Sequence, residues 1–116
     1  METQKYYRTY ASVDLSAIEN NINELKKKLK KGVLTLATVK ADAYGHGAVG
    51  VAVSIQGMVD YFGIAELGEA VELREAGVEK PILVLSYTCN RCCGKALSAS
   101  LHQRPQVFRQ NLYCVS

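Results

Sequence analysis

The stretch TVKADAYGHGAVG, residues 38–50, decides how the fold is interpreted, because it places a lysine and a glycine-rich loop between two apolar segments. The segment before it, VLTLATV at 33–39, is short and β-branched, which is typical of a strand covered on both faces of a parallel sheet. The segment after it, 48–55, is expected to be a helix, although Gly50 weakens it. Lys40 therefore stands at the carboxyl end of an expected buried strand, where parallel α/β folds bind ligands.

The same alternation continues downstream. Further strands are expected at 61–65 and 81–86, with a helix at 66–77 between them. Three glutamates are expected on the outward face of that helix: Glu69, Glu72 and Glu75. Strands that alternate with helices predict a parallel sheet with crossover connections, either a barrel or a doubly wound sheet.

A helix is also expected upstream. Ser16 followed by Glu19 forms a capping-box pattern, and Gly32 supplies a stop signal. Apolar residues recur at helical spacing between them: Ile18, Ile22, Leu25 and Leu29. The last turn is rich in lysine, at Lys27, Lys28, Lys30 and Lys31. Since the helix dipole favours cations there, we interpret these lysines as a helix end and not as a nucleic-acid patch. Before the helix, TYASVDL at 9–15 alternates and predicts one more strand, without an obvious partner.

The charge of the chain is unevenly placed. Residues 1–88 carry ten Lys or Arg against eleven Asp or Glu, whereas 89–116 carry four basic residues and no acid. No nucleic-acid motif accompanies the excess, so no nucleic-acid partner is expected. The longest uncharged run, 43–59, falls short of the roughly 18 to 20 apolar residues of a membrane helix. No secretory signal opens the chain, and a cytoplasmic location without membrane contact is expected.

The pattern of strands and helices stops after Thr88. In this chain of 116 residues, we interpret 8–88 as one architecture and 89–116 as an atypical, irregular tail that does not belong to it. A shifted reading frame, an early stop and a disordered segment are the alternatives for its origin. Reading the underlying gene distinguishes them.

All four cysteines fall in this tail: Cys89, Cys92, Cys93 and Cys114. CNRC has the C-x-x-C spacing of a zinc half-site, and His102 with Cys114 would complete four ligands. The overall spacing fits none of the common zinc patterns. We therefore expect free cysteines and no metal site.

Two readings of the central loop compete. Gly45, Gly47 and Gly50 match the G-x-G-x-x-G fingerprint of dinucleotide-binding folds, with Glu66 placed 16 residues further on. That fingerprint needs its first glycine in the tight turn at the strand end, and residues 40–44 intervene here.

The other reading uses the lysine. A strand-end lysine that faces a cavity is partly desolvated, which favours a neutral amine able to form a Schiff base with an aldehyde. Tyr44 can offer its hydroxyl to a phosphate, and the following glycines can bring backbone donors close to an anion. The alternative for Lys40 is a side chain that only extends along the surface into water.

The residues themselves favour the lysine. TVKADAYGHG closely resembles the lysine motif of alanine racemases, enzymes that use pyridoxal 5′-phosphate (PLP) to interconvert L- and D-alanine. ASVDLSAIENNI, residues 11–22, is similar to the opening strand and first helix of that family. Residues 60–88, DYFGIAELGEAVELREAGVEKPILVLSYT, are similar to its second and third units.

The resemblance implies a fold and a site. The family has an eight-stranded α/β barrel followed by a β domain, so this chain is expected to form about three βα units of a partial (β/α)8 TIM-type barrel. Lys40 aligns with the Schiff-base lysine, which is also one of two acid/base groups at the substrate Cα. Tyr44 aligns with a tyrosine that binds the cofactor phosphate. His46 is expected to pack within the loop and to have no catalytic role, and Asp42 is expected to serve the hydrogen bonds of the loop itself.

The resemblance also implies what is missing. The second catalytic base of the family, a tyrosine from the partner subunit, and an arginine facing the pyridine nitrogen have no counterpart here. We therefore expect an amino-acid racemase by family, an isomerase, of which this chain is an inactive fragment. A homodimer and alanine as small-molecule substrate are implied, without a distinction from serine. The alternatives are a non-catalytic PLP-binding barrel protein, a fragment that binds nothing and a dinucleotide-binding domain.

Overall fold

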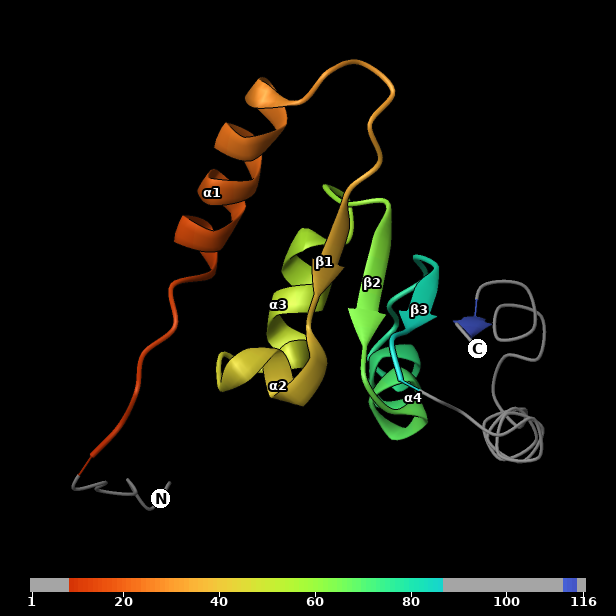
Figure 1. The fold of residues 1–116 in the computed structure, drawn as a ribbon. Helices are drawn as coiled ribbons and strands as arrows, with labels where there is room; N and C mark the ends of the chain where they lie inside the picture. Colours follow the sequence, from red (N-terminus) through yellow and green to blue (C-terminus); the bar gives the residue numbers. More distant parts are fainter. Residues whose placement is uncertain (1–8, 87–111, 115–116) are drawn as a thin grey trace.

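The computed structural model describes residues 9–86 and the backbone of a last strand at 112–114. The elements are α1 (Leu15–Lys28), β1 (Leu36–Thr38), α2 (Lys40–Tyr44), α3 (Ala48–Ile55), β2 (Tyr61–Ile64), α4 (Leu67–Glu75), β3 (Ile82–Val84) and β4 (Leu112–Cys114). The strands form one parallel sheet in the order β1-β2-β3-β4 (Figure 1). Parallel strands joined by crossover helices were predicted, and this is confirmed. The sequential strand order is that of a barrel wall, so the fold is a partial TIM-type barrel.

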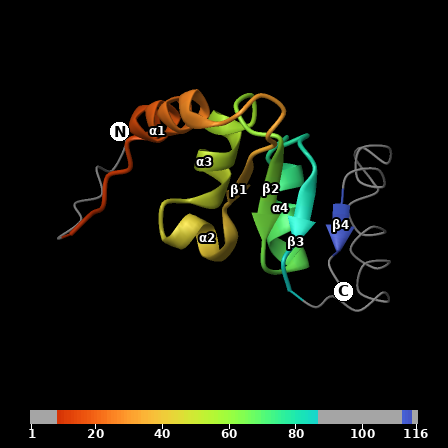
Figure 2. The same cartoon turned by 45° about the horizontal axis from the view of Figure 1, so that its top comes forward.

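The core lies between the sheet and the helices α3 and α4, which cover the same face of it (Figures 1 and 2). Alternate residues of β2 and β3 point into this core because side chains alternate across a strand. The largest side chains that are fully buried there are Phe62, Ile64, Leu73, Ile82, Val39, Val78 and Val84. The core therefore forms from three short strands and two short helices.

The opposite face of the sheet is open among the described residues. Leu36 on β1 is 41% exposed, and Leu85, which follows β3, is 43% exposed. The expectation that residues 33–39 are covered on both faces is wrong, since β1 is shorter than expected and lies at the edge of the sheet. The expectation of a buried strand holds for β2, in which Phe62–Ile64 are buried.

Helix α1 begins after Asp14 and not at Ser16. The Asp14 carboxylate accepts the backbone N–H of Ala17 at 3.1 Å, and the Ser16 hydroxyl donates to the same oxygen at 2.6 Å. Aspartate and serine are about equally good N-caps, so the sequence alone did not separate them. The helix ends at Lys28, before the expected stop at Gly32.

Helix α1 packs lightly against the rest of the fold. Ile18 and Ile22 contact the core, whereas Leu25 is 54% exposed. Figure 2 shows α1 lying against α3, where the Ser54 hydroxyl donates a hydrogen bond to Glu19. Polar contacts therefore supplement a small apolar interface.

Both ends of the chain differ from expectation. Residues 9–14 form no strand, and Leu15 already begins α1, so the predicted strand at 9–15 is wrong. In the tail, Leu112–Cys114 form β4 and pair with β3. Cys89, Cys92, Cys93 and His102 lie outside the described residues. In the described part of the chain, no helix has the length and apolarity needed to cross a membrane, and no three metal-ligating side chains gather.

Asp60 joins the segment before β1 to the start of β2. Its carboxylate accepts the N–H of Thr35 at 2.7 Å and the Thr35 hydroxyl at 3.0 Å. In return, the N–H groups of Asp60 and Tyr61 donate to the Thr35 carbonyl, each at 3.0 Å. The Thr35 N–H and hydroxyl hold the pKa of Asp60 below its usual value, with help from the positive charges of Lys26 and Lys80.

This contact predicts acid sensitivity. A pKa that is lower in the folded chain stabilises the fold above the unfolded-state pKa, and that contribution is lost as pH falls through the folded pKa. At pH values below about 4, we expect the unfolding temperature of the unmodified chain to decrease. The decrease should be smaller in the Asp60→Asn variant. Circular dichroism melts between pH 7 and 3 measure this, with Glu72→Gln as the control at an exposed carboxylate. Equal pH profiles for Asp60→Asn and the unmodified chain would contradict the assignment.

Candidate functional site

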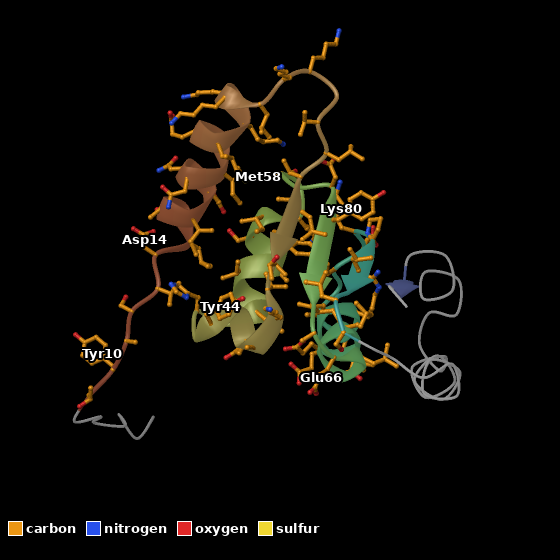
Figure 3. All side chains as sticks on the ribbon, in the orientation of Figure 1. Tyr10, Asp14, Tyr44, Met58, Glu66 and Lys80 are labelled. Atoms are coloured by element: carbon orange, nitrogen blue, oxygen red, sulfur yellow. The ribbon has the colours of Figure 1, made fainter. Side chains whose placement is uncertain are left out.

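Lys40 lies where the sequence predicted, at the carboxyl end of β1. Val39, which is only 2% exposed, separates Lys40 from the strand. Lys40 is half-buried. The strand arrows in Figure 1 point towards α2 and the turn before α4. Figure 3 labels Tyr44 and Glu66 at this same edge of the sheet. The edge therefore gathers the loops that follow β1 and β2.

The segment α2 is a left-handed turn. Ala41, Asp42 and Ala43 have φ angles of 51°, 54° and 52°, and Tyr44 has 53°. Left-handed helical geometry costs L-residues roughly 1–2 kcal/mol each, because Cβ crowds the following carbonyl. The Ala43 N–H donates to the Val39 carbonyl at 2.9 Å and closes the turn. Nothing in the sequence signalled this conformation, since four successive residues without a glycine rarely adopt it.

Hydrogen bonds inside the loop hold this turn in place. The Asp42 carboxylate accepts the N–H of Ala48 at 2.8 Å, which caps the start of α3. His46 Nδ1 lies 3.0 Å from the Ala43 carbonyl oxygen. Asp42 and His46 thus serve the loop, as expected. Gly47, with φ 85°, allows the backbone to turn into α3.

The turn predicts an unusual response to glycine. Ala41→Gly should raise the free energy of unfolding by about 1 kcal/mol, because glycine tolerates positive φ. Ala17→Gly, at an exposed alanine in the right-handed helix α1, should lower it by about 1 kcal/mol. Urea unfolding of both variants and of the unmodified chain measures these two changes in the free energy of unfolding. A loss of stability in both variants would exclude left-handed geometry at Ala41.

Two polar groups of this region make no hydrogen bond within the part of the chain that the structure describes. Neither the Lys40 ε-amine nor the Tyr44 hydroxyl makes a hydrogen bond to any residue that the structure describes. Tyr44 is 66% exposed, so its ring and hydroxyl are accessible. The backbone of Lys40 is nevertheless held, because the Val39 N–H donates to the Gly63 carbonyl at 2.9 Å. An exposed tyrosine and a partly buried lysine therefore lie at the carboxyl end of β1.

Glu69 is a residue of this region that sequence reasoning missed. It was expected to point outward like Glu72 and Glu75, which are exposed. Instead its Oε1 accepts the N–H of Ala41 at 2.6 Å. Its Oε2 accepts the N–H groups of Ala65 at 2.7 Å and Glu66 at 3.0 Å. The signal was its spacing, because a glutamate three positions after a helix N-cap reaches back to free backbone donors.

The glycine pattern does not form a dinucleotide site. A doubly wound sheet binds its ligand where the strand order reverses, and the four described strands run in sequential order. The turn α2 also separates β1 from Gly45, so no glycine occupies the tight turn at the strand end. The alternative based on Gly45, Gly47 and Gly50 is therefore wrong.

Comparisons with known proteins agree with this architecture. Residues 13–108 match the family described as "Alanine racemase, N-terminal domain". The alanine racemase of Streptococcus pneumoniae (strain Hungary19A-6) is 48% identical over 88 residues, which are 76% of this chain and 24% of the relative. The match to the family extends past Thr88, and the domain boundary at 8–88 remains a prediction.

Solved structures show the same relationship. The alanine racemase of Clostridium difficile 630 superposes with a TM-score of 0.75 and 35% identity, covering 84% of this chain and 26% of that one. The alanine racemase of Bacillus anthracis, solved with bound L-Ala-P, gives a TM-score of 0.74 and 36% identity over 84% and 26% of the two chains. The chain thus spans about a quarter of the length of the proteins it matches.

Proposed function

The chain belongs to the alanine racemase family, a family of isomerases, and on this basis we propose that Lys40 and Tyr44 hold PLP in a site for alanine racemisation. The single observation that supports this most directly is that neither the Lys40 ε-amine nor the Tyr44 hydroxyl, both near the carboxyl end of β1, hydrogen-bonds to a described residue. Lys40 precedes and Tyr44 ends a strained turn in which the Asp42 carboxylate and His46 Nδ1 are bonded within the loop.

The residues present fit this cofactor chemically. A primary amine can bond covalently to an aldehyde, and a phenol can donate a hydrogen bond to a phosphate oxygen. Lys40 would hold the aldehyde end and Tyr44 the phosphate end. When bound, PLP supplies an electron sink for the negative charge that develops at the substrate Cα.

Lys40 would also carry half of the proton transfer. Its amine can take a proton from one face of Cα, or return one there, as a general acid/base. Inversion requires a second group on the opposite face, and no described residue is assigned to that role. We propose that the 116-residue chain by itself does not racemise alanine. For a protein with the full barrel of the family, we also propose a cytoplasmic location and assembly as a homodimer.

The test is covalent trapping. The chain is incubated with PLP, reduced with borohydride and mapped by peptide mass spectrometry. We expect a pyridoxyl group on the peptide containing Lys40, and less of it when Tyr44→Phe removes the hydroxyl. A label spread evenly over the exposed lysines of α1 would contradict a specific site. Formation of D-alanine from L-alanine would contradict the proposed inactivity of the chain alone.

A further inference from the structure

One carboxylate joins the loops that follow two neighbouring strands. Glu69 stands in the first turn of α4, yet its Oε1 reaches the backbone of Ala41 in α2. Its Oε2 is bonded to the turn between β2 and α4, through the N–H groups of Ala65 and Glu66. The side chain therefore connects the carboxyl ends of β1 and β2 at the edge where Lys40 lies.

The bond to Ala41 has a specific effect on Lys40. Ala41 is the first residue with left-handed dihedral angles, at φ 51° and ψ 49°. Its N–H, like the first N–H groups of any helical turn, has no partner within the turn itself. Glu69 satisfies it. The backbone of Lys40 is thus held on both sides, by the Val39 N–H on Gly63 and by the Ala41 N–H on Glu69.

The charge of Glu69 suits this role. Partial burial raises the pKa of Glu69, but the N–H groups of Glu66, Ala41 and Ala65, with the positive charge of Lys40, outweigh it and lower the pKa below its usual value. The side chain is therefore an ionised acceptor near neutral pH, and hydrogen bonds to a charged acceptor are the stronger kind.

We propose that Glu69 is a positioning residue for Lys40, because its carboxylate fixes the left-handed turn that begins at Ala41 and so sets the direction in which the lysine side chain leaves the backbone. The proposal rests on the proposed function of Lys40. In this role Glu69 acts through the backbone of Ala41 and touches neither substrate nor cofactor.

The test compares three substitutions in the whole chain. Glu69→Ala removes the acceptor, Glu69→Asp keeps the charge but shortens its reach, and Glu69→Gln keeps the length but loses the charge and one acceptor oxygen. Glu72→Ala is the matched control, on the same helix at an exposed glutamate. The first readout is amide hydrogen exchange at Ala41 measured by NMR, relative to Phe62 in the core. We expect Ala41 to lose about tenfold protection in the Ala and Asp variants, with a smaller loss in Gln.

The second readout reports the orientation of Lys40. PLP attached to a fixed lysine shows induced circular dichroism, and this signal should weaken together with the fraction trapped by borohydride. Both signals should be strongest in the unmodified chain and in Glu72→Ala, weaker in Glu69→Gln, and weakest in Glu69→Asp and Glu69→Ala. A residue that only stabilised α4 would change the melting temperature without this ranking.

The outcomes separate the two proposals. If the unmodified chain takes the label and Glu69→Ala matches its dichroism, the positioning role is excluded while the function of Lys40 stands. If the unmodified chain takes no label, the proposed function fails. If amide exchange at Ala41 is the same in Glu69→Ala as in the unmodified chain, the role of Glu69 is also excluded. If Glu69→Ala does not fold, the Gln and Asp variants decide by the same two readouts.

Discussion

Lys40→Arg is expected to abolish covalent attachment of PLP while leaving the fold intact. Arginine keeps the positive charge and most of the side-chain length, but its guanidinium stays protonated and cannot act as the amine nucleophile. The Lys40 ε-amine makes no hydrogen bond to the described residues, so the stability should change by no more than about 0.5 kcal/mol. Borohydride trapping with mass mapping, together with a thermal melt, measures both effects.

The matched control is Lys30→Arg, at an exposed lysine between α1 and β1. It should leave the yield of the pyridoxyl label at residue 40 unchanged. Equal labelling of the Lys40→Arg chain would show that PLP reacts elsewhere, and the site would then have to be abandoned.

Phe62→Ala is expected to have the largest effect on stability. Phe62 is 0% exposed and lies in the middle of the sheet, paired with Ala37 on β1 and with Ile82 on β3. Truncation of a buried phenylalanine costs about 3–5 kcal/mol, through lost burial and the cavity that remains. Since small domains have roughly 5–15 kcal/mol in total, we expect a midpoint lowered by more than about 10 °C, or loss of cooperative unfolding.

Leu36→Ala is the matched control for this truncation. Leu36 lies on the neighbouring strand but on the open face, where it is 41% exposed. Its loss should cost clearly less than that of Phe62, about 1–2 kcal/mol, because Leu36 is partly exposed and its truncation leaves no closed cavity. Equal losses for the two variants would mean that the face of the sheet away from α3 and α4 is covered as tightly as the core.

Local sequence patterns predicted the elements well where burial and periodicity agree. Helix α3 occupies 48–55 as expected, because its apolar residues pack directly onto the sheet. The strands β1, β2 and β3 fall within the expected segments and are shorter at their ends. Lys40 follows the strand as expected, since an apolar run that ends in a charge marks the edge of a sheet.

What sequence reasoning missed depends on contacts between distant segments. The bond from Glu69 to the backbone N–H of Ala41 joins residues 28 positions apart, and no helical periodicity contains that information. The exposure of Leu36 follows from its place at an open sheet edge, which is a property of the assembled strands. Strand β4 lies in a segment with no sustained apolar run, so the sequence pattern did not indicate it.

The hand of the turn after Lys40 has a stereochemical consequence. Ala41 and Ala43 adopt dihedral angles that are the mirror image of an ordinary helix, and these are the angles that D-amino acids prefer. At position 41, where the side chain is exposed, a chemically synthesised chain should therefore accept a D-residue more readily than its L-counterpart. The backbone beside the proposed catalytic amine thus has the local chirality of the opposite enantiomeric series.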